Sequence, residues 1–217
     1  MPPKAILAGI LIVGFLGTLP MWLTGTAEQK QHMAQSTAAK FIVDQSVGSL
    51  ALQPEEKERL RRDLQVQKEE QPDFEETVWM QDMRQLIRPW VPDAGEAETI
   101  ARWVYIYSQR FDLSPELILA VIAVETNFDH FAVSNVGAHG LMQVMPFWKK
   151  TLGSKDDNLF EIETNIRYGA AILRMYKDRY HSLDRALAAY NGSLGSHRYP
   201  NKIYKVMKRF KASSDDL

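Results

Sequence analysis

The chain has 217 residues, a formal net charge of −1 at pH 7 and no cysteine. This length suits one compact domain with additional segments. The near-neutral charge argues against a nucleic-acid-binding protein, and the absence of cysteine excludes disulfides, thiolate metal sites and a cysteine nucleophile.

An uncharged apolar segment, residues 5–23, lies close to the N-terminus. A helix needs roughly 20 apolar residues to span a bilayer, so we predict a membrane-spanning signal anchor within residues 1–27. Lys4 precedes the segment, which by the positive-inside tendency predicts export of everything that follows. The alternative is a signal peptide that is cleaved near the small residues 25–27.

Residues 28–93 are rich in Gln, Glu, Lys and Arg and poor in large apolar residues. Strong helix formers with mixed charges predict an exposed helix over residues 54–64. A second helix is expected over residues 74–87, where Val78, Met83 and Leu86-Ile87 could make a narrow apolar stripe. We interpret this region as a stalk of short, solvated helices, with a partner-binding role as the alternative.

Residues 94–217 have helical rather than alternating hydrophobic periodicity, which predicts an all-α domain. Ser114 followed by proline is a typical helix start. The run Leu117 to Val124 is apolar on every side, so this helix should lie buried in the middle of the domain. The other helices are expected over residues 94–111, 163–180, 183–190 and 200–210.

Glu125 ends this apolar helix. Burial favours the neutral acid, and the negative end of the helix dipole opposes a further negative charge. Both effects raise the pKa of Glu125 toward the range of a general acid. The alternative is a glutamate that faces water as the helix leaves the core.

A compact loop, residues 132–146, follows this glutamate. Gly137 and Gly140 permit tight turns in it, and the loop could form one wall of a cleft. Gln143 stands in an otherwise apolar stretch and needs partners if buried. Its amide could bind a sugar hydroxyl or acetamido group, or it could cap a neighbouring backbone group.

Three sequence blocks resemble the lytic transglycosylases of the soluble-transglycosylase (SLT) type, in the lysozyme-like superfamily. Residues 125–128 (ETNF) are similar to the family's Glu-Ser-x-Phe, and residues 132–146 are similar to its A-x-S-x-x-G-A-x-G-L-M-Q-x-M-P. The third block combines Asn165-Ile166 with ALAAYN at residues 186–191. The resemblance covers residues 117–191 and implies a lysozyme-like catalytic domain.

The resemblance also implies roles for particular residues. Glu125 matches the family's catalytic acid and base. The expected substrate-binding residues, which match groove positions of the family, are Ser134, Met142, Gln143, Asn165 and Tyr190. The tyrosine hydroxyl is expected to approach Glu125. The alternatives are capping for the serine and Asn165, core packing for Met142 and Tyr190, and a helix C-cap for Asn191.

Two departures from the family pattern concern the edge of the cleft. Thr126 replaces the usual serine, which is a mild change because both carry a hydroxyl. Residues 192–195 read Gly-Ser-Leu-Gly where many relatives have Ala-Gly-Pro-Gly. Subsite preferences are therefore open, whereas the chemistry need not change.

The implied reaction needs one carboxyl and neither metal nor cofactor. Most glycosidases use two carboxylates, but the nearby Asp112 and Asp129 do not match catalytic positions. Glu125 would protonate the β-1,4 glycosidic oxygen between N-acetylmuramic acid and N-acetylglucosamine, then accept the C6 hydroxyl proton as a 1,6-anhydro ring closes. The alternatives are a goose-type-like hydrolytic lysozyme and a non-catalytic peptidoglycan-binding component of an envelope machine.

The expected location is the periplasmic side of the bacterial inner membrane, with the N-terminal helix as anchor. The expected partners are peptidoglycan glycan strands, the inner membrane and envelope-machine proteins, and no nucleic acid.

Overall fold

The computed structural model describes residues 52–65 and 74–212. Within these ranges the chain is helical, and its only β-like features are isolated bridges between Val133, His139 and Val144. The helices are α2 (Pro54–Gln65), α3 (Phe74–Ile87), α4 (Ala94–Phe111), α5 (Pro115–Thr126), α6 (Phe147–Leu152), α7 (Ile162–Tyr180), α8 (Leu183–Tyr190) and α9 (Arg198–Ala212). The expectation of an all-α domain is therefore confirmed for the described residues.

The predicted membrane-spanning helix lies outside the described residues. Of the helices that the structure does describe, none combines the length and the apolar character that crossing a bilayer requires.

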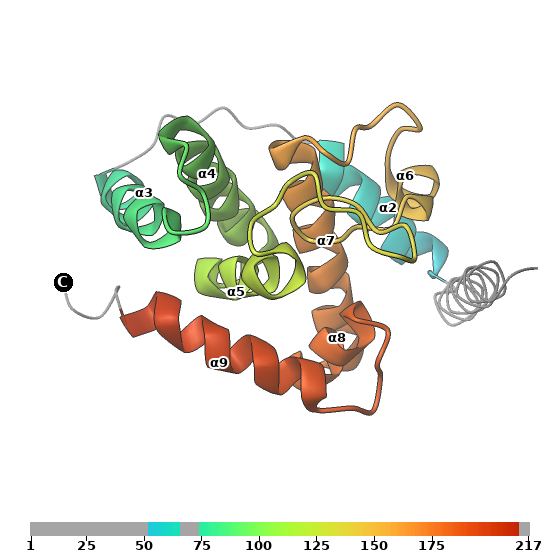
Figure 1. Ribbon diagram of the computed structural model, residues 1–217. Coiled ribbons are helices and arrows are strands. Elements are labelled where there is room, and N and C mark those ends of the chain that lie inside the picture. Colours follow the sequence, from blue (N-terminus) through green and yellow to red (C-terminus); the bar gives the residue numbers. More distant parts are fainter. Residues whose placement is uncertain (1–51, 66–73, 213–217) are drawn as a thin grey trace, which may run out of the picture.

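Helix α5 lies between the other helices of the domain, packed against α4 and α9 (Figure 1). It begins as predicted, because the Ser114 side chain accepts a hydrogen bond from the Leu117 amide and Pro115 occupies the first turn. Every residue from Leu117 to Ala123 is buried. Sequence and packing agree here, since a helix that is apolar on every side needs neighbours on every side.

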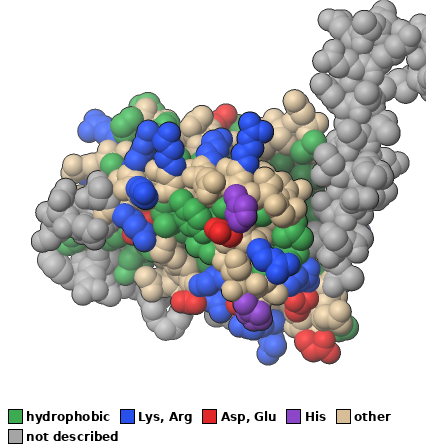
Figure 2. All heavy atoms as spheres, turned by 90° about the horizontal axis from the view of Figure 1, so that it is seen from below, with side chains coloured by type: hydrophobic (Ala, Val, Ile, Leu, Met, Phe, Trp, Pro, Cys, Tyr) green, Lys and Arg blue, Asp and Glu red, His purple; other side chains and the backbone are tan. Residues whose placement is uncertain are grey.

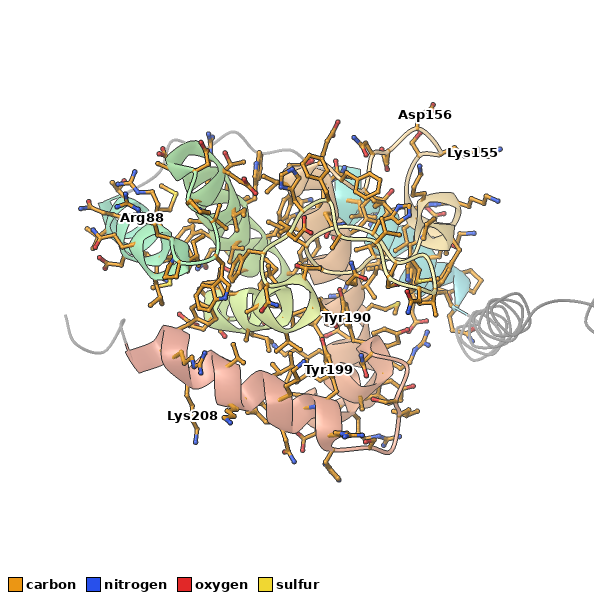
Figure 3. The ribbon with its side chains drawn as sticks, viewed as in Figure 1. Arg88, Lys155, Asp156, Tyr190, Tyr199 and Lys208 are labelled. Atoms are coloured by element: carbon orange, nitrogen blue, oxygen red, sulfur yellow. The ribbon has the colours of Figure 1, made fainter. Side chains whose placement is uncertain are left out.

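Helix α9 covers α5 with one face and meets solvent with the other. Tyr199, Ile203 and Phe210 are buried on the inner face. Figure 2 looks at the molecule from below, the side on which α9 lies, and Lys and Arg side chains are spread over this face. In Figure 3, Lys208 points away from the domain, whereas Tyr199 lies among α5, α8 and α9.

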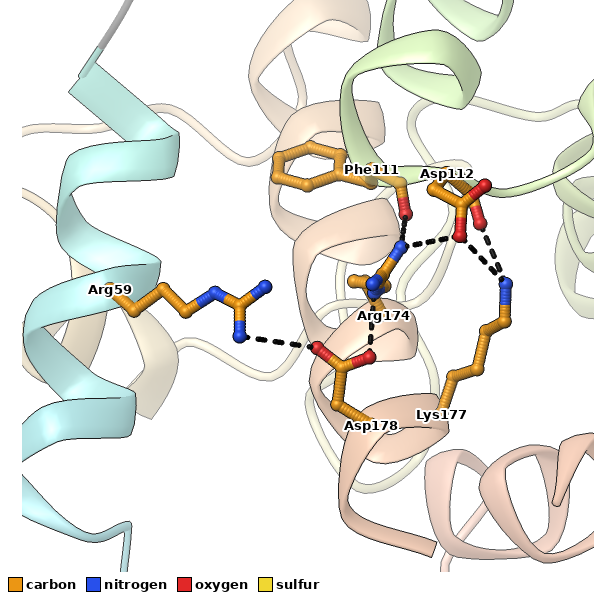
Figure 4. A network of polar contacts seen from close by, with 6 residues as sticks. All are labelled: Arg59, Phe111, Asp112, Arg174, Lys177 and Asp178. Atoms are coloured by element: carbon orange, nitrogen blue, oxygen red, sulfur yellow. Dashed lines mark hydrogen bonds and ion pairs between the residues drawn. The ribbon is translucent and has the colours of Figure 1, made fainter. Parts of the chain in front are cut away.

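A polar network fixes the turn between α4 and α5 (Figure 4). Arg174 on α7 donates to the Phe111 carbonyl oxygen (2.9 Å) and to the Asp112 carboxylate (2.8 Å). Lys177, one helical turn later, donates to the Asp112 carbonyl oxygen (2.8 Å). Asp112 itself has a left-handed backbone conformation with φ 47°. The start of α5 is thus held from α7 as well as by its own cap.

The described parts of the predicted stalk pack against the domain, so the expectation of solvated helices is wrong for them. Leu60 and Leu64 share one face of α2 and are buried in the common core. Arg179 on α7 pairs with Glu56 (2.9 Å), and Arg167 donates to the Leu64 carbonyl oxygen (2.8 Å). Two leucines at i and i+4 suffice to bury one side of a short polar helix.

Helix α3 likewise packs against α4. Met83 and Ile87 from the predicted apolar stripe are fully buried there, whereas Val78 remains partly exposed. The helix ends at Ile87, as the following prolines suggested. The boundary between stalk and catalytic domain at residue 94 stays a prediction.

The packing of α2 can be tested with Leu64→Ala in the full chain. Leu64 is 3% exposed, so truncation should lower the free energy of unfolding by about 2–4 kcal/mol through lost burial and a residual cavity. The matched control is Leu194→Ala, whose leucine is 53% exposed and should cost less than about 0.5 kcal/mol. Denaturant unfolding measures both, and equal effects would mean that α2 does not pack on the domain.

Candidate active site

Glu125 occupies the last turn of α5, where the apolar helix opens into the loop that follows. The helix ends at Thr126 and is capped by Asn127, whose left-handed conformation (φ 51°) is continued by Phe128 (φ 68°). The Thr126 hydroxyl lies 3.0 Å from the carbonyl oxygen of Leu141 and binds it. The hydroxyl that replaces the family's serine thus ties the end of α5 to the predicted cleft wall.

The carboxyl of Glu125 accepts a hydrogen bond from the Tyr199 hydroxyl, with 2.5 Å between the two oxygens. Burial raises the pKa of Glu125 above the ordinary value for a glutamate, and the hydrogen bond from Tyr199 and the positive charge of Lys202 offset part of this shift. The predicted direction of the pKa is therefore confirmed. The Glu125 carboxyl therefore resists ionisation, although the hydrogen bond from Tyr199 stabilises its ionised form.

Asn165 organises the loop from the start of α7. Its amide donates to the carbonyl oxygens of His139 (2.8 Å) and Leu159 (2.7 Å), and its oxygen accepts from the Met142 amide (2.8 Å). Gly140 makes this possible, because a Cβ there would lie 2.3 Å from the Asn165 nitrogen. Asn165 is 1% exposed, so the structure differs from the expected sugar contact: its amide is fully used inside the protein.

Met142 also lies inside the fold rather than on the groove surface. Its side chain is fully buried and packs against Gly169, where a Cβ would come within 2.5 Å of the sulfur. The Met142 carbonyl oxygen accepts a hydrogen bond from the Tyr190 hydroxyl (2.8 Å). The structure thus favours the core-packing alternative for Met142.

Tyr190 lies close to Glu125 without bonding it. Its hydroxyl is committed to Met142, and burial, followed by the negative charge of Glu125, raises the pKa of Tyr190 well above its ordinary value. Tyr190 thus lies near Glu125, as expected, but the hydrogen bond to the Glu125 carboxyl comes from Tyr199. Asn191 ends α8 as a C-cap, in agreement with its predicted structural role.

Ser134 and Gln143 lie in the loop as predicted and bond to its backbone. The Ser134 oxygen accepts from the Ala138 amide (2.9 Å), which leaves its own O–H available as a donor. Gln143 has a left-handed conformation (φ 52°), and its amide nitrogen donates to the Gly140 carbonyl oxygen (3.0 Å). Both side chains are partly exposed, so contact with a sugar stays a prediction for them.

The two other acids considered from the sequence are placed elsewhere. Asp112 lies before the start of α5, a 12-residue helix and therefore roughly 18 Å from end to end, whereas Glu125 lies at its other end. The Asp129 carboxylate accepts from the Phe131 amide (2.9 Å) and caps the loop. Among the described residues, no group of three or more His, Cys, Asp or Glu side chains could hold a metal ion.

Tyr199 is the site residue that sequence reasoning missed. It belongs to the apolar face of α9, together with Ile203 and Phe210, and on periodicity alone it looks like core. Only the way in which α9 crosses the end of α5 brings its hydroxyl to Glu125, and no local sequence signal encodes that crossing.

The Tyr199–Glu125 bond can be tested by titrating Glu125 in the Tyr199→Phe variant. A hydrogen bond to the carboxylate favours ionisation, so its loss should raise the pKa of Glu125 further above that of the wild type. Tyr204→Phe is the matched control, since this tyrosine of the same helix donates to Asp184 (2.6 Å) and its loss should leave Glu125 unchanged. NMR of labelled glutamate carboxyl carbons measures all three proteins. An unchanged or lowered midpoint in Tyr199→Phe would contradict the bond.

Comparison with known proteins is consistent with this arrangement. Residues 103–212 match the model of the transglycosylase SLT domain. The chain is 37% identical over 105 residues to a transglycosylase of Enterobacteria phage PRD1, covering 45% of this chain and 39% of that protein.

Bacterial relatives show similar identities. A membrane-bound lytic murein transglycosylase F of Desulfosudis oleivorans is 35% identical over 99 residues (42% of this chain, 21% of the relative). A membrane-bound lytic murein transglycosylase C of Actinobacillus pleuropneumoniae is 34% identical over 100 residues (40% and 27%). The match therefore spans about two fifths or less of these relatives' lengths. Because the family model covers half of the chain, from the middle of α4 to the end of α9, the chain belongs to the transglycosylase SLT domain family.

Proposed function

We propose that this protein is a peptidoglycan lytic transglycosylase that cleaves the bond between N-acetylmuramic acid and N-acetylglucosamine with Glu125 as its acid and base. The observation that carries the proposal is the partly buried Glu125 carboxyl with a raised pKa, bonded to Tyr199 at the end of α5. A raised pKa increases the fraction of the Glu125 carboxyl that carries a proton, which it can give to a leaving oxygen.

The first step breaks the glycosidic bond. One Glu125 oxygen accepts from the Tyr199 hydroxyl at 2.5 Å, so the other oxygen carries the proton toward the glycosidic oxygen. As the bond from C1 of the muramic residue breaks, the leaving N-acetylglucosamine takes this proton and Glu125 becomes a carboxylate. The Tyr199 hydrogen bond and the Lys202 charge, which both favour the ionised form, stabilise the carboxylate at this moment.

The second step returns the proton. The Glu125 carboxylate accepts the proton of the muramic C6 hydroxyl while that oxygen bonds to C1, which closes the 1,6-anhydro ring. Glu125 ends protonated, as it began, and no water is consumed. The nucleophile comes from the sugar itself, so the absence of a second acid from the matched motif is no obstacle.

Ser134, Gln143 and Tyr190 are the residues that we propose to line the groove beside Glu125. The Ser134 hydroxyl and the Gln143 side chain offer polar contacts from the loop. Met142 and Asn165, which the resemblance also nominated, we assign to holding the loop, because both are buried.

We further propose that the protein works on the periplasmic side of the inner membrane, anchored by its apolar residues 5–23. Two relatives carry the description membrane-bound in their names, which supports a place in the envelope. Proteins of an envelope-spanning machine are the proposed partners, besides the glycan strands themselves.

Digestion of purified peptidoglycan by the full chain tests this function. Glu125→Gln is nearly isosteric and removes the acid, so the release of soluble fragments should fall about 10²–10⁴-fold, the usual contribution of a general acid. The control is Glu116→Gln, in the first turn of the same helix, which should keep the wild-type rate. Chromatography of the released fragments gives the rates.

Two outcomes would overturn the proposal. A folded Glu125→Gln protein that digests peptidoglycan at the wild-type rate would remove Glu125 from the mechanism. A wild-type chain that binds peptidoglycan but releases nothing would favour the non-catalytic binding component.

A further inference from the structure

Helix α9 carries a row of cations along its outer face. Arg198, Lys202, Lys205 and Arg209 follow one another at spacings of four, three and four residues, which places them on one side of a helix. We call these four residues the basic ridge. Its length is roughly 16 Å at 1.5 Å per residue. Lys208, beside the ridge, also points away from the domain (Figure 3).

The basic ridge is not explained by the packing of the fold. All four side chains are exposed, α9 contains no acidic residue, and none of the four forms an ion pair within residues 52–65 and 74–212. Cations of α7 behave differently, since Arg174 and Arg179 pair with carboxylates of Asp112 and Glu56. In a chain of net charge −1, four such cations in line form a local positive surface.

The ridge begins beside the catalytic carboxyl. Tyr199 follows the first ridge residue directly and donates to Glu125, and Lys202 is close enough for its charge to favour ionisation of Glu125. The remaining two cations, Lys205 and Arg209, continue from there along the helix. A polymer whose scissile bond lies at Glu125 therefore has part of its length within reach of this row.

We propose that the basic ridge binds the carboxylates of the stem peptides that hang from the muramic residues of the glycan strand. The inference rests on the proposed function, since it concerns the strand held at Glu125. In a peptide-bearing strand each lactyl carboxyl of the muramic residues is used in the amide bond to a peptide. The peptide carboxylates are therefore the part of this substrate that complements a row of cations. The ridge would make the protein favour peptide-bearing over peptide-free strands.

An anionic membrane surface is the competing partner for such a row. The placement favours the substrate, because a membrane lying along the ridge would crowd the strand bound at Glu125. Exposed ion pairs are individually weak and are screened by salt, so the ridge should adjust affinity and selectivity rather than decide binding alone.

The test is a binding measurement that does not depend on cleavage. The full chain carries Glu125→Gln to prevent digestion, and fluorescence anisotropy follows its binding to labelled, uncross-linked glycan strands. The strands are either peptide-bearing or stripped of peptides by an amidase, with the freed lactyl carboxylates then capped as methylamides so that the stripped strands are uncharged. Lys205→Gln with Arg209→Gln neutralises the part of the ridge farther from Glu125. Arg88→Gln with Lys155→Gln is the matched control, since both are exposed cations on other sides of the domain.

The parent protein should bind peptide-bearing strands more tightly than stripped ones. The ridge variant should lose about threefold to tenfold in affinity for peptide-bearing strands at low salt and nothing for stripped strands, whereas the control variant should match the parent on both. Unchanged binding of the ridge variant, or an equal loss on both strands, would overturn the proposal.

A second experiment distinguishes a ridge that binds the membrane from a ridge that binds the substrate. If the ridge variant loses binding to phosphatidylglycerol vesicles while its preference for peptide-bearing strands persists, the ridge serves the membrane and the proposal is wrong. If binding to peptide-bearing strands depends on the ridge but the wild-type protein releases no fragments from peptidoglycan, the proposed function is refuted and the ridge proposal stands. If the wild-type protein digests peptidoglycan but the Glu125→Gln parent shows no preference for peptide-bearing strands, the ridge proposal is refuted and the proposed function stands.

Discussion

Ionisation of Glu125 is opposed by its surroundings, and the rest of the site depends on this constraint. The carboxyl ends a helix whose preceding residues are buried on every side, so burial raises its pKa. The helix is held at its start by the Ser114 cap and by Arg174, which bonds the turn before it. Displacement of α5 would change both the solvation of the carboxyl and its distance from Tyr199.

The loop after Glu125 depends on a second buried polar group. Asn165 satisfies three backbone groups of the loop and its flanks from inside the fold, and the Tyr190 hydroxyl and Thr126 hydroxyl add bonds to Met142 and Leu141. Buried polar groups without partners are costly, so this arrangement permits few alternative loop conformations. Asn165 and Tyr190, which the family resemblance assigned to substrate binding, thus hold the backbone of the loop in place.

Much of the fold could be predicted because local signals agreed with the tertiary structure. The start of α5 follows from a serine cap and a proline, and α4 has the predicted bounds Ala94–Phe111. The packing of α2 could not be predicted, because two leucines in a polar helix give a weak pattern whose partner lies on α7, more than a hundred residues away in the chain. The short helix α6 was also missed, since six residues give too little periodicity to read.

Some residues of the site could likewise be predicted from the sequence, and others could not. Glu125 stood out from the sequence because one carboxylate interrupts an apolar run. Tyr199 did not, since a buried tyrosine on an amphipathic helix is usually core, and only the crossing of α9 over α5 gives its hydroxyl a role. Asn165 and Met142 were expected in the groove because motif matching identifies positions without showing which way their side chains point.

In the proposed mechanism one carboxyl suffices, because the sugar itself supplies the nucleophile. The most direct test is digestion of peptidoglycan by the full chain in heavy-oxygen water, with mass spectrometry of the muramic acid ends. The muramic acid ends should be lighter by one water than hydrolysis products and should contain no heavy oxygen. Reducing ends that have incorporated heavy oxygen would contradict this mechanism and would show that Glu125 activates water, as in a lysozyme.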